Sequence, residues 1–154
     1  MERLELVWRD VSKMVFLRPF QDSEIQAFLF SMSTNTLCWT DIPVTDLNRA
    51  VAFYSAVLGE AVKMQSGPGF EFGLLPHCEN NASGCLCVME DNQPSQTGPL
   101  VYFSVEGRLD AAIAAARSGG GQVVIEKHPI GPYGFRAVII DSEGNRVALH
   151  SKSA

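Results

Sequence analysis

The stretch WTDIPVTDLNRAVAFYSAVLG, residues 39–59, joins an apolar segment to an amphipathic helix through a capping sequence. Thr45 or Asp46 can act as the N-cap, because a side-chain oxygen can accept hydrogen bonds from the free N–H groups of a first helical turn. Apolar residues then recur at three- and four-residue spacing, which is the pattern of a helix that buries one face. Gly59 stands where a left-handed C-terminal cap is expected. The stretch therefore predicts a strand over 37–44 and a helix that ends at Gly59.

The same order of elements occurs twice along the chain. A shift of 61 positions, which separates Val44 from Val105, also places Gly59 on Gly120. In both copies a strand and a helix precede three short apolar segments, separated by loops rich in Gly, Pro and Asn. The later strands of the first copy are expected at 61–65, 70–75 and 84–89. The second copy is expected to have a strand at 100–105, a helix at 109–117 and strands at 122–126, 135–141 and 146–150.

This repeat predicts an α+β fold made of two tandem βαβββ modules in one domain, residues 37–151. The modules span 37–90 and 99–151, and the polar segment 91–98 (DNQPSQTG) is typical of a linker. Residues 1–36 stand outside the repeat as an N-terminal extension or arm. Two interpretations stay open for it: a non-native or upstream extension, or an arm that packs on a partner subunit.

Composition narrows the classes of partner. The chain of 154 residues has a formal net charge of -5, which argues against nucleic acid or an anionic membrane as the main partner and hints at a cationic ligand. No apolar run approaches the ~20 residues that span a bilayer, and the first residues do not have the pattern of a secretory signal. The four cysteines form no CxxC pair. We expect reduced, mostly buried thiols in a cytoplasmic protein.

The opening stretch resembles the start of proteins of the vicinal-oxygen-chelate superfamily, and GPYGFRAVIIDSEGNRVALHS, residues 131–151, resembles their end. This superfamily includes glyoxalase, extradiol dioxygenases and the bleomycin-resistance proteins. The resemblance covers about residues 37–151. It implies modules that form an open, cup-shaped mixed β half-barrel with flanking helices. The resemblance does not identify the reaction, because proteins with this fold catalyse many different reactions.

In the metal-using members, His, Glu or Gln ligands come from the first and fourth strands of each module. The motif spacing and the internal repeat place the four ligand positions at Trp39, Cys87, Leu100 and Ala148. Three of these side chains cannot ligate a metal, and a lone cysteine does not hold Mg, Mn, Ni or Fe in this setting. We therefore predict that the usual metal site is absent, and we expect no cofactor.

Other residues on the presumed inner face are candidates for binding a ligand. His150 shares a strand face with Ala148, and it is either a general base or hydrogen-bond partner, or a rim histidine without a role. Asp41 shares the face of Trp39, and it either meets a cationic group or is hydrogen-bonded locally. His77 and His128 are expected in exposed loops.

Aromatic side chains are expected on the walls of the same cleft. Trp39 and Tyr102 would lie on one wall and Phe72 and Phe135 on others, where they stack on a planar ligand or fill the barrel. The candidate ligand-binding set is Trp39, Asp41, Phe72, Cys87, Leu100, Tyr102, Phe135, Ala148 and His150.

Three functions remain after these observations. The first is a small-molecule-binding protein of the bleomycin-resistance type, with a planar or cationic ligand. The second is a lyase, isomerase or dioxygenase of the glyoxalase type, which depends on a metal held by non-standard ligands, such as His150, Asp41 and Cys87, or uses a metal-free proton transfer. The third is a structural or interaction module. A homodimer is expected in each case, because βαβββ units leave sheet edges and one apolar face uncovered.

Overall fold

A computed structural model describes residues 36–67, 69–78 and 81–153. The predicted N-terminal arm lies outside the described residues, apart from residue 36. The first module contains β1 (Trp39–Pro43), α2 (Leu47–Leu58), β2 (Lys63–Gly67), β3 (Phe70–Leu74) and β4 (Ser83–Cys87). The second contains β5 (Val101–Ser104), α3 (Leu109–Ser118), β6 (Gln122–Pro129), the short 3-10 helix η2 (Gly131–Tyr133), β7 (Phe135–Ile140) and β8 (Arg146–Ser151).

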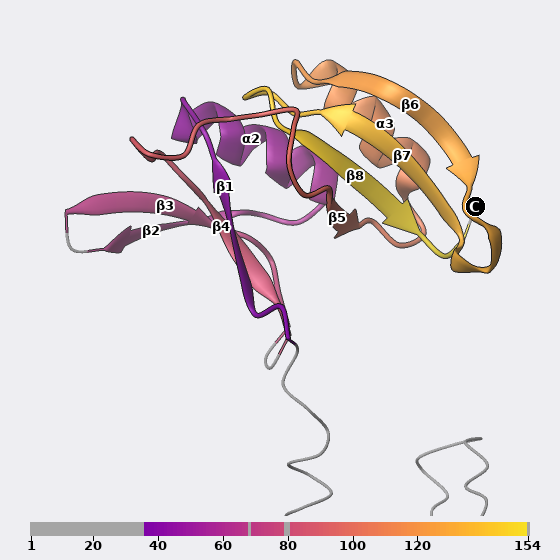
Figure 1. Cartoon of the computed structure of the whole chain (residues 1–154), viewed down its shortest axis with the longest axis horizontal. Helices are drawn as coiled ribbons and strands as arrows, with labels where there is room; N and C mark the ends of the chain where they lie inside the picture. The colour runs from indigo at the N-terminus through magenta and orange to yellow at the C-terminus, as the bar shows by residue number, and fades with distance from the viewer. Residues whose placement is uncertain (1–35, 68, 79–80, 154) are drawn as a thin grey trace, which may run out of the picture. The chain divides into compact units, whose positions relative to one another are not determined.

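Each module forms one four-stranded mixed sheet, and neither sheet closes on itself. The strand orders are β1-β4-β3-β2 and β5-β8-β7-β6. In both sheets the first strand pairs with the last strand in parallel, and the other pairs are antiparallel. Figure 1 shows the two sheets with their helices. The prediction of an α+β fold with two βαβββ modules is confirmed.

The ends of α2 are those that its sequence predicts. The side chain of Asp46 accepts a hydrogen bond from the backbone N–H of Arg49, and Gly59 adopts the left-handed conformation with φ 73°. The first helix of the second module, α3, follows Arg108 and has no side-chain N-cap. Its alanine-rich sequence favours a helix without that contribution.

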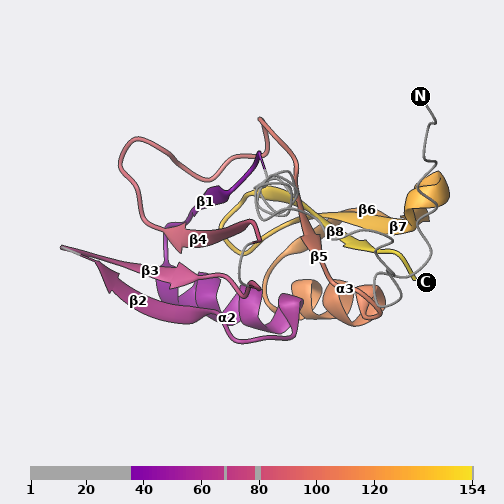
Figure 2. The ribbon, with the colours of Figure 1, turned by 90° about the horizontal axis from the view of Figure 1, so that it is seen from below.

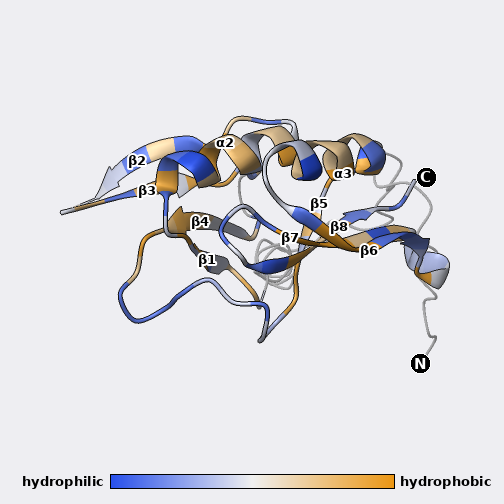
Figure 3. Cartoon of the chain, turned by 90° about the horizontal axis from the view of Figure 1, so that it is seen from above, coloured by the Kyte–Doolittle hydropathy of each residue, from blue (hydrophilic) through white to orange (hydrophobic). Residues whose placement is uncertain are grey.

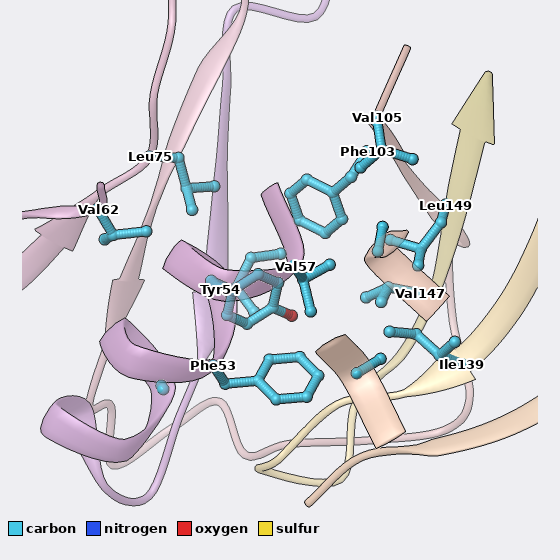
Figure 4. Packing of buried hydrophobic residues seen from close by; sticks show 14 of the residues in the cluster. Phe53, Tyr54, Val57, Val62, Leu75, Phe103, Val105, Ile139, Val147 and Leu149 are labelled. Atoms are coloured by element: carbon cyan, nitrogen blue, oxygen red, sulfur yellow. The ribbon is translucent and has the colours of Figure 1, made fainter. Parts of the chain in front are cut away.

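Both helices bury one face in a single hydrophobic core. Figures 2 and 3 show α2 and α3 on the same side of the strands β1, β4, β7 and β8. Figure 4 shows Phe53, Tyr54 and Val57 of α2 in one cluster with Phe103 of β5 and Leu149 of β8. The rings of Tyr54 and Phe103 lie 5.4 Å apart between centroids. The two modules therefore share a core and do not form independent units.

A turn of the second module fixes the start of the first module's helix. The side chain of Glu143 accepts hydrogen bonds from the backbone N–H groups of Thr45 and Asp46 and from the guanidinium of Arg49. In the same turn Asn145 donates to the carbonyl oxygen of Pro43 at 2.9 Å. These contacts hold the end of β1 at a fixed place beside the second module. The same strand carries two of the candidate site residues, Trp39 and Asp41.

The structure corrects two local predictions. β6 continues to Pro129, so His128 lies on a strand and is half-buried, whereas the sequence predicted an exposed loop there. Proline is tolerated at this place because β6 is an edge strand and Pro129 is its last residue. Two of the four thiols, Cys38 and Cys78, are exposed, whereas the sequence predicted mostly buried thiols.

Among the residues that the structure describes, no helix has the length and apolar character needed to cross a membrane.

Candidate functional site

The candidate site residues lie on the distal face of each sheet, by which we mean the face turned away from α2 and α3. Alternation along β1 shows the two faces: Ile42 is buried in the core, whereas Trp39 and Asp41 are exposed on the other side. On β8, Leu149 points into the core and Ala148 and His150 lie on the distal face.

On the first sheet, the pairing of β1 with β4 brings a carboxylate beside two thiols. Asp41 is opposite Cys85, and Pro43 is opposite Cys87. The two strands approach closely because β4 carries Gly84, where a Cβ would lie 2.3 Å from the carbonyl oxygen of Thr40. One ligand atom from each of Asp41, Cys85 and Cys87 lies within 4.8 Å of the other two.

Asp41 organises this cluster. Its Oδ1 accepts a hydrogen bond from the indole N–H of Trp39 at 2.8 Å and one from the thiol of Cys85 at 3.3 Å. Burial raises the pKa of Cys85 to about 12, and the hydrogen bond to Asp41 adds to the shift. Burial also raises the pKa of Cys87. Both thiols are therefore protonated at neutral pH, and neither is an activated nucleophile.

Aromatic rings surround the same cluster. Trp39 is 47% exposed, and its ring orientation is set by the bond to Asp41. Phe72 of β3 is opposite Cys87, so it lies on the distal face beside the thiols. The ring of Phe70 lies 5.7 Å from that of Phe72. The first sheet therefore presents aromatic surface, one carboxylate and two neutral thiols.

On the second sheet, the register aligns four polar residues across all four strands. Ser104 of β5 is opposite His150 of β8, His150 is opposite Arg136 of β7, and Arg136 is opposite His128 of β6. We call Ser104, His150, Arg136 and His128 the polar row. Tyr102 lies next to it: its ring is 6.4 Å from that of His150, and its hydroxyl accepts a hydrogen bond from Arg136.

Seven of the nine predicted site residues lie on the distal faces, four on the first sheet and three on the second. The distal face of the first sheet carries Trp39, Asp41, Phe72 and Cys87, and that of the second carries Tyr102, Ala148 and His150. Leu100 is half-buried and precedes β5 by one residue. Phe135 packs against the core, on the opposite face of β7 from Arg136, because side chains alternate along a strand. His77 is exposed in the loop after β3, as predicted.

Sequence reasoning missed Cys85, Arg136 and His128. The strand pairing makes Cys85 the counterpart of Ala148, since Cys85 is opposite Asp41 and Ala148 is opposite Tyr102. A constant repeat spacing had pointed to Cys87 instead. The alternation in FRAVII, residues 135–140, was the available signal for Arg136, because it places Phe135 and Arg136 on opposite faces.

At the positions where the resemblance places metal ligands, the donors do not fit a hard divalent cation. Trp39, Leu100 and Ala148 offer no ligand atom, and cysteine sulfur at the fourth position prefers softer metals. The neighbouring group Asp41, Cys85 and Cys87 has a different chemistry, because two sulfurs and one oxygen suit zinc.

Comparisons with known proteins agree with this fold. No protein-family model matches the chain. A glyoxalase/bleomycin resistance protein from Albidiferax ferrireducens superposes with a TM-score of 0.60 at 19% identity, over 76% of this chain and 98% of that one. Glyoxalase I from Zea mays superposes with a TM-score of 0.57 at 18% identity, over 75% of this chain and 45% of that one. The fold and the paired modules are those of the glyoxalase/bleomycin-resistance/dioxygenase class.

A sequence relative points to the same class. The chain is 34% identical over 112 residues to the proteins named "Putative glyoxylase CFP32" of Mycobacterium bovis and Mycobacterium tuberculosis. The match covers 72% of this chain and 42% of those relatives, so the chain spans less than half of their length. Together these likenesses are consistent with the vicinal-oxygen-chelate superfamily, which the opening and closing motifs of the chain resemble.

Proposed function

We propose that this protein binds a small planar molecule on the distal faces of its sheets, without the divalent cation that metal-using members of the superfamily hold. One observation carries the proposal: Trp39 and Tyr102, which are 47% and 45% exposed, present large aromatic surfaces on these faces beside polar groups. Exposed aromatic rings fixed by hydrogen bonds are suited to stack on a planar ligand. The carboxylate of Asp41 beside Trp39 favours a ligand with a cationic group near the first sheet.

Replacing Trp39 by alanine is expected to weaken the binding of a planar cation by roughly fivefold or more, because a stacked ring contributes about 1 kcal/mol beyond its buried area. Titration calorimetry with the planar cation proflavine measures the change, and neutral acridone tests the contribution of charge. Val124→Ala is the control, since Val124 is 52% exposed on an edge strand of the other module. Equal affinities for the wild type and the folded Trp39→Ala variant would refute a role of Trp39 in binding.

A second candidate function, a metal-dependent enzyme with non-standard ligands, is favoured by the group Asp41, Cys85 and Cys87. Three protein ligands with a fourth position left for water or substrate are the arrangement of catalytic zinc sites. When bound, the metal would supply a Lewis acid on the distal face. The residues of this chain would orient it through the bond from Trp39 to Asp41.

For this candidate we expect stoichiometric zinc binding that tightens as the pH rises, because the high pKa values of Cys85 and Cys87 mean that zinc must displace their protons. Calorimetry with zinc measures this, and absorption of the cobalt-substituted protein reports thiolate ligation. Cys85→Ser and Cys87→Ser should each weaken binding by roughly tenfold or more. Cys78→Ser, at an exposed thiol, is the control. Identical zinc isotherms in all variants would remove this candidate.

Homodimer formation and a cytoplasmic location stay predictions. Edge strands β2 and β6 have no strand partner on one side in the described part of the chain, which supports assembly with a second copy.

A further inference from the structure

We propose that the polar row of the second sheet is a binding site for the anionic group of a small molecule, a carboxylate or a phosphate, with Arg136 as the residue that contacts it. The inference rests on the proposed function only in that a ligand binds on the distal faces. It adds a chemical class that the net charge of -5 does not suggest.

Arg136 is held in one orientation by contacts on two sides. Its Nε donates to Nε2 of His128 at 3.1 Å, and its Nη1 donates to the hydroxyl oxygen of Tyr102. His128 is itself fixed, because its Nδ1 lies 2.9 Å from the carbonyl oxygen of Glu126. Since Nε2 accepts the bond from Arg136, Nδ1 carries the ring proton and donates it to that carbonyl. The guanidinium is therefore oriented by its neighbours before any ligand binds.

The charge of Arg136 has no counter-ion among the described residues. The ion pairs in this part of the chain are Arg49–Glu143, Arg117–Glu126 and Lys127–Asp110. Glu126, the acid nearest in sequence on β6, is paired with Arg117. Arg136 is half-buried as a residue, and its guanidinium lies 5.9 Å from the centre of the Tyr102 ring without a carboxylate partner, so its charge is only partly compensated.

The remaining donors of the row point to an anion. After the bonds to His128 and Tyr102, the other N–H groups of Arg136 lie on Nη1 and Nη2, and no described residue accepts from them. A guanidinium with free terminal N–H groups matches the paired oxygens of a carboxylate or phosphate. His150, whose Nε2 lies 2.6 Å from the carbonyl oxygen of Tyr133, and the exposed residue Ser104 continue the row on the neighbouring strands. The distal-face positions of β5 to β8 in this register carry no Asp or Glu that would compete.

The hydrogen bonds to neighbouring side chains also distinguish Arg136 from an ordinary surface arginine. Arg146 lies on the same face one strand away, but it is exposed, and no described side chain is hydrogen-bonded to its guanidinium. Water alone can hydrogen-bond the guanidinium of such an exposed side chain and stabilise its charge. The hydrogen bonds of Arg136 to neighbouring strands restrict its side chain to few rotamers, and this restriction costs conformational entropy. Hydrogen bonds from the guanidinium to a bound anion would offset that cost.

The test uses the full chain and three probes with one ring each: benzoate, phenyl phosphate and uncharged benzyl alcohol. We expect saturable binding of at least one anion by calorimetry, and no binding of benzyl alcohol. Arg136→Gln should reduce the affinity for that anion about tenfold or more, and Arg136→Lys should restore only part of it, because lysine keeps the charge but not the paired donors. The preferred probe decides between carboxylate and phosphate.

Arg146→Gln is the matched control, since it removes the same charge from the same face. An equal loss of affinity in Arg146→Gln and Arg136→Gln, or no saturable binding of either anion to the wild type, would overturn the proposal. Thermal unfolding of each variant shows that it is folded. Proflavine titration keeps the two proposals apart: binding of proflavine without binding of either anion defeats this inference alone, and the reverse result counts only against the planar cationic ligand of the proposed function.

Discussion

Replacing Asp141 by alanine is expected to lower the free energy of unfolding by about 3–5 kcal/mol, the largest effect of any single change considered for this protein. Asp141 is 3% exposed and lies in the turn between β7 and β8. Its side chain accepts hydrogen bonds from the hydroxyl of Tyr54 at 2.6 Å, from the backbone N–H groups of Glu143 and Asn145, and from the amide of Asn145.

The cost arises from the groups that would lose their partner. Tyr54 has no exposed surface, and its hydroxyl would be left buried without an acceptor. Burial, followed by the nearby charge of Asp141, raises the pKa of Tyr54 well above its usual value, so this hydroxyl is a donor at every working pH. The bond joins α2 of the first module to a turn of the second, and its loss therefore weakens the contact between modules.

Chemical denaturation followed by circular dichroism measures the change in stability. Asp110→Ala is the control, because the side chain of Asp110 is 75% exposed in its ion pair with Lys127 and should contribute less than about 1 kcal/mol. A loss of stability in Asp141→Ala as small as that of the control would contradict the assigned role of the buried network.

Replacing Glu143 by glutamine is expected to lower the free energy of unfolding by about 2 kcal/mol at pH 7. Burial alone would raise the pKa of Glu143, but hydrogen bonds from Arg49, Thr45 and Asp46 outweigh it and lower the pKa to about 2. The side chain has no exposed surface, whereas Arg49 is 50% exposed, and this exposure reduces the expected value.

The sign of the pH dependence follows from the lowered pKa. A carboxylate with a folded pKa near 2 contributes its stability in full above the unfolded value of about 4.3, and loses it as the pH falls toward 2. The difference in unfolding free energy between wild type and Glu143→Gln should therefore be largest above about pH 5 and smallest near pH 2.

Chemical denaturation of both proteins at several pH values measures how the difference in unfolding free energy changes with pH. Glu106, whose pKa is also lowered to about 2, first by the backbone N–H of Lys152, adds to the acid sensitivity of both proteins. The comparison of variants cancels that contribution. A difference that does not change with pH would show that Glu143 stabilises the turn by packing and not by its charge.

The elements of this fold were more predictable than its site, and α2 shows why. Its cap, its apolar stripe and its terminal glycine are local signals, so neighbouring residues alone narrowed the N-cap to Thr45 or Asp46 and placed the helix end at Gly59. The site depends on which residues of distant strands lie opposite one another. The pairing of Cys85 with Asp41 joins segments that are far apart in sequence, and no local pattern fixes that register.

The same reasoning applies to the second sheet. His128 precedes a proline and a glycine-rich turn, and these signals predicted a loop although the strand continues to Pro129. Phe135 was predicted on the wall of the cleft because it is aromatic, but it packs against the core. Its neighbour Arg136 lies on the distal face of β7 instead. The contact from Arg136 to Tyr102 crosses strands and could not be read from either segment alone.

The hydrogen bonds from the start of α2 to Glu143 have a consequence for biosynthesis. The ribosome completes the first module near Val88, roughly 55 residues before it adds Glu143, which corresponds to about 3–10 s of translation. During this interval the backbone N–H groups of Thr45 and Asp46, just before α2, lack the carboxylate of Glu143, and the hydroxyl of Tyr54 lacks Asp141. The nascent first module therefore remains incompletely stabilised until the turn that carries Asp141 and Glu143 has been translated.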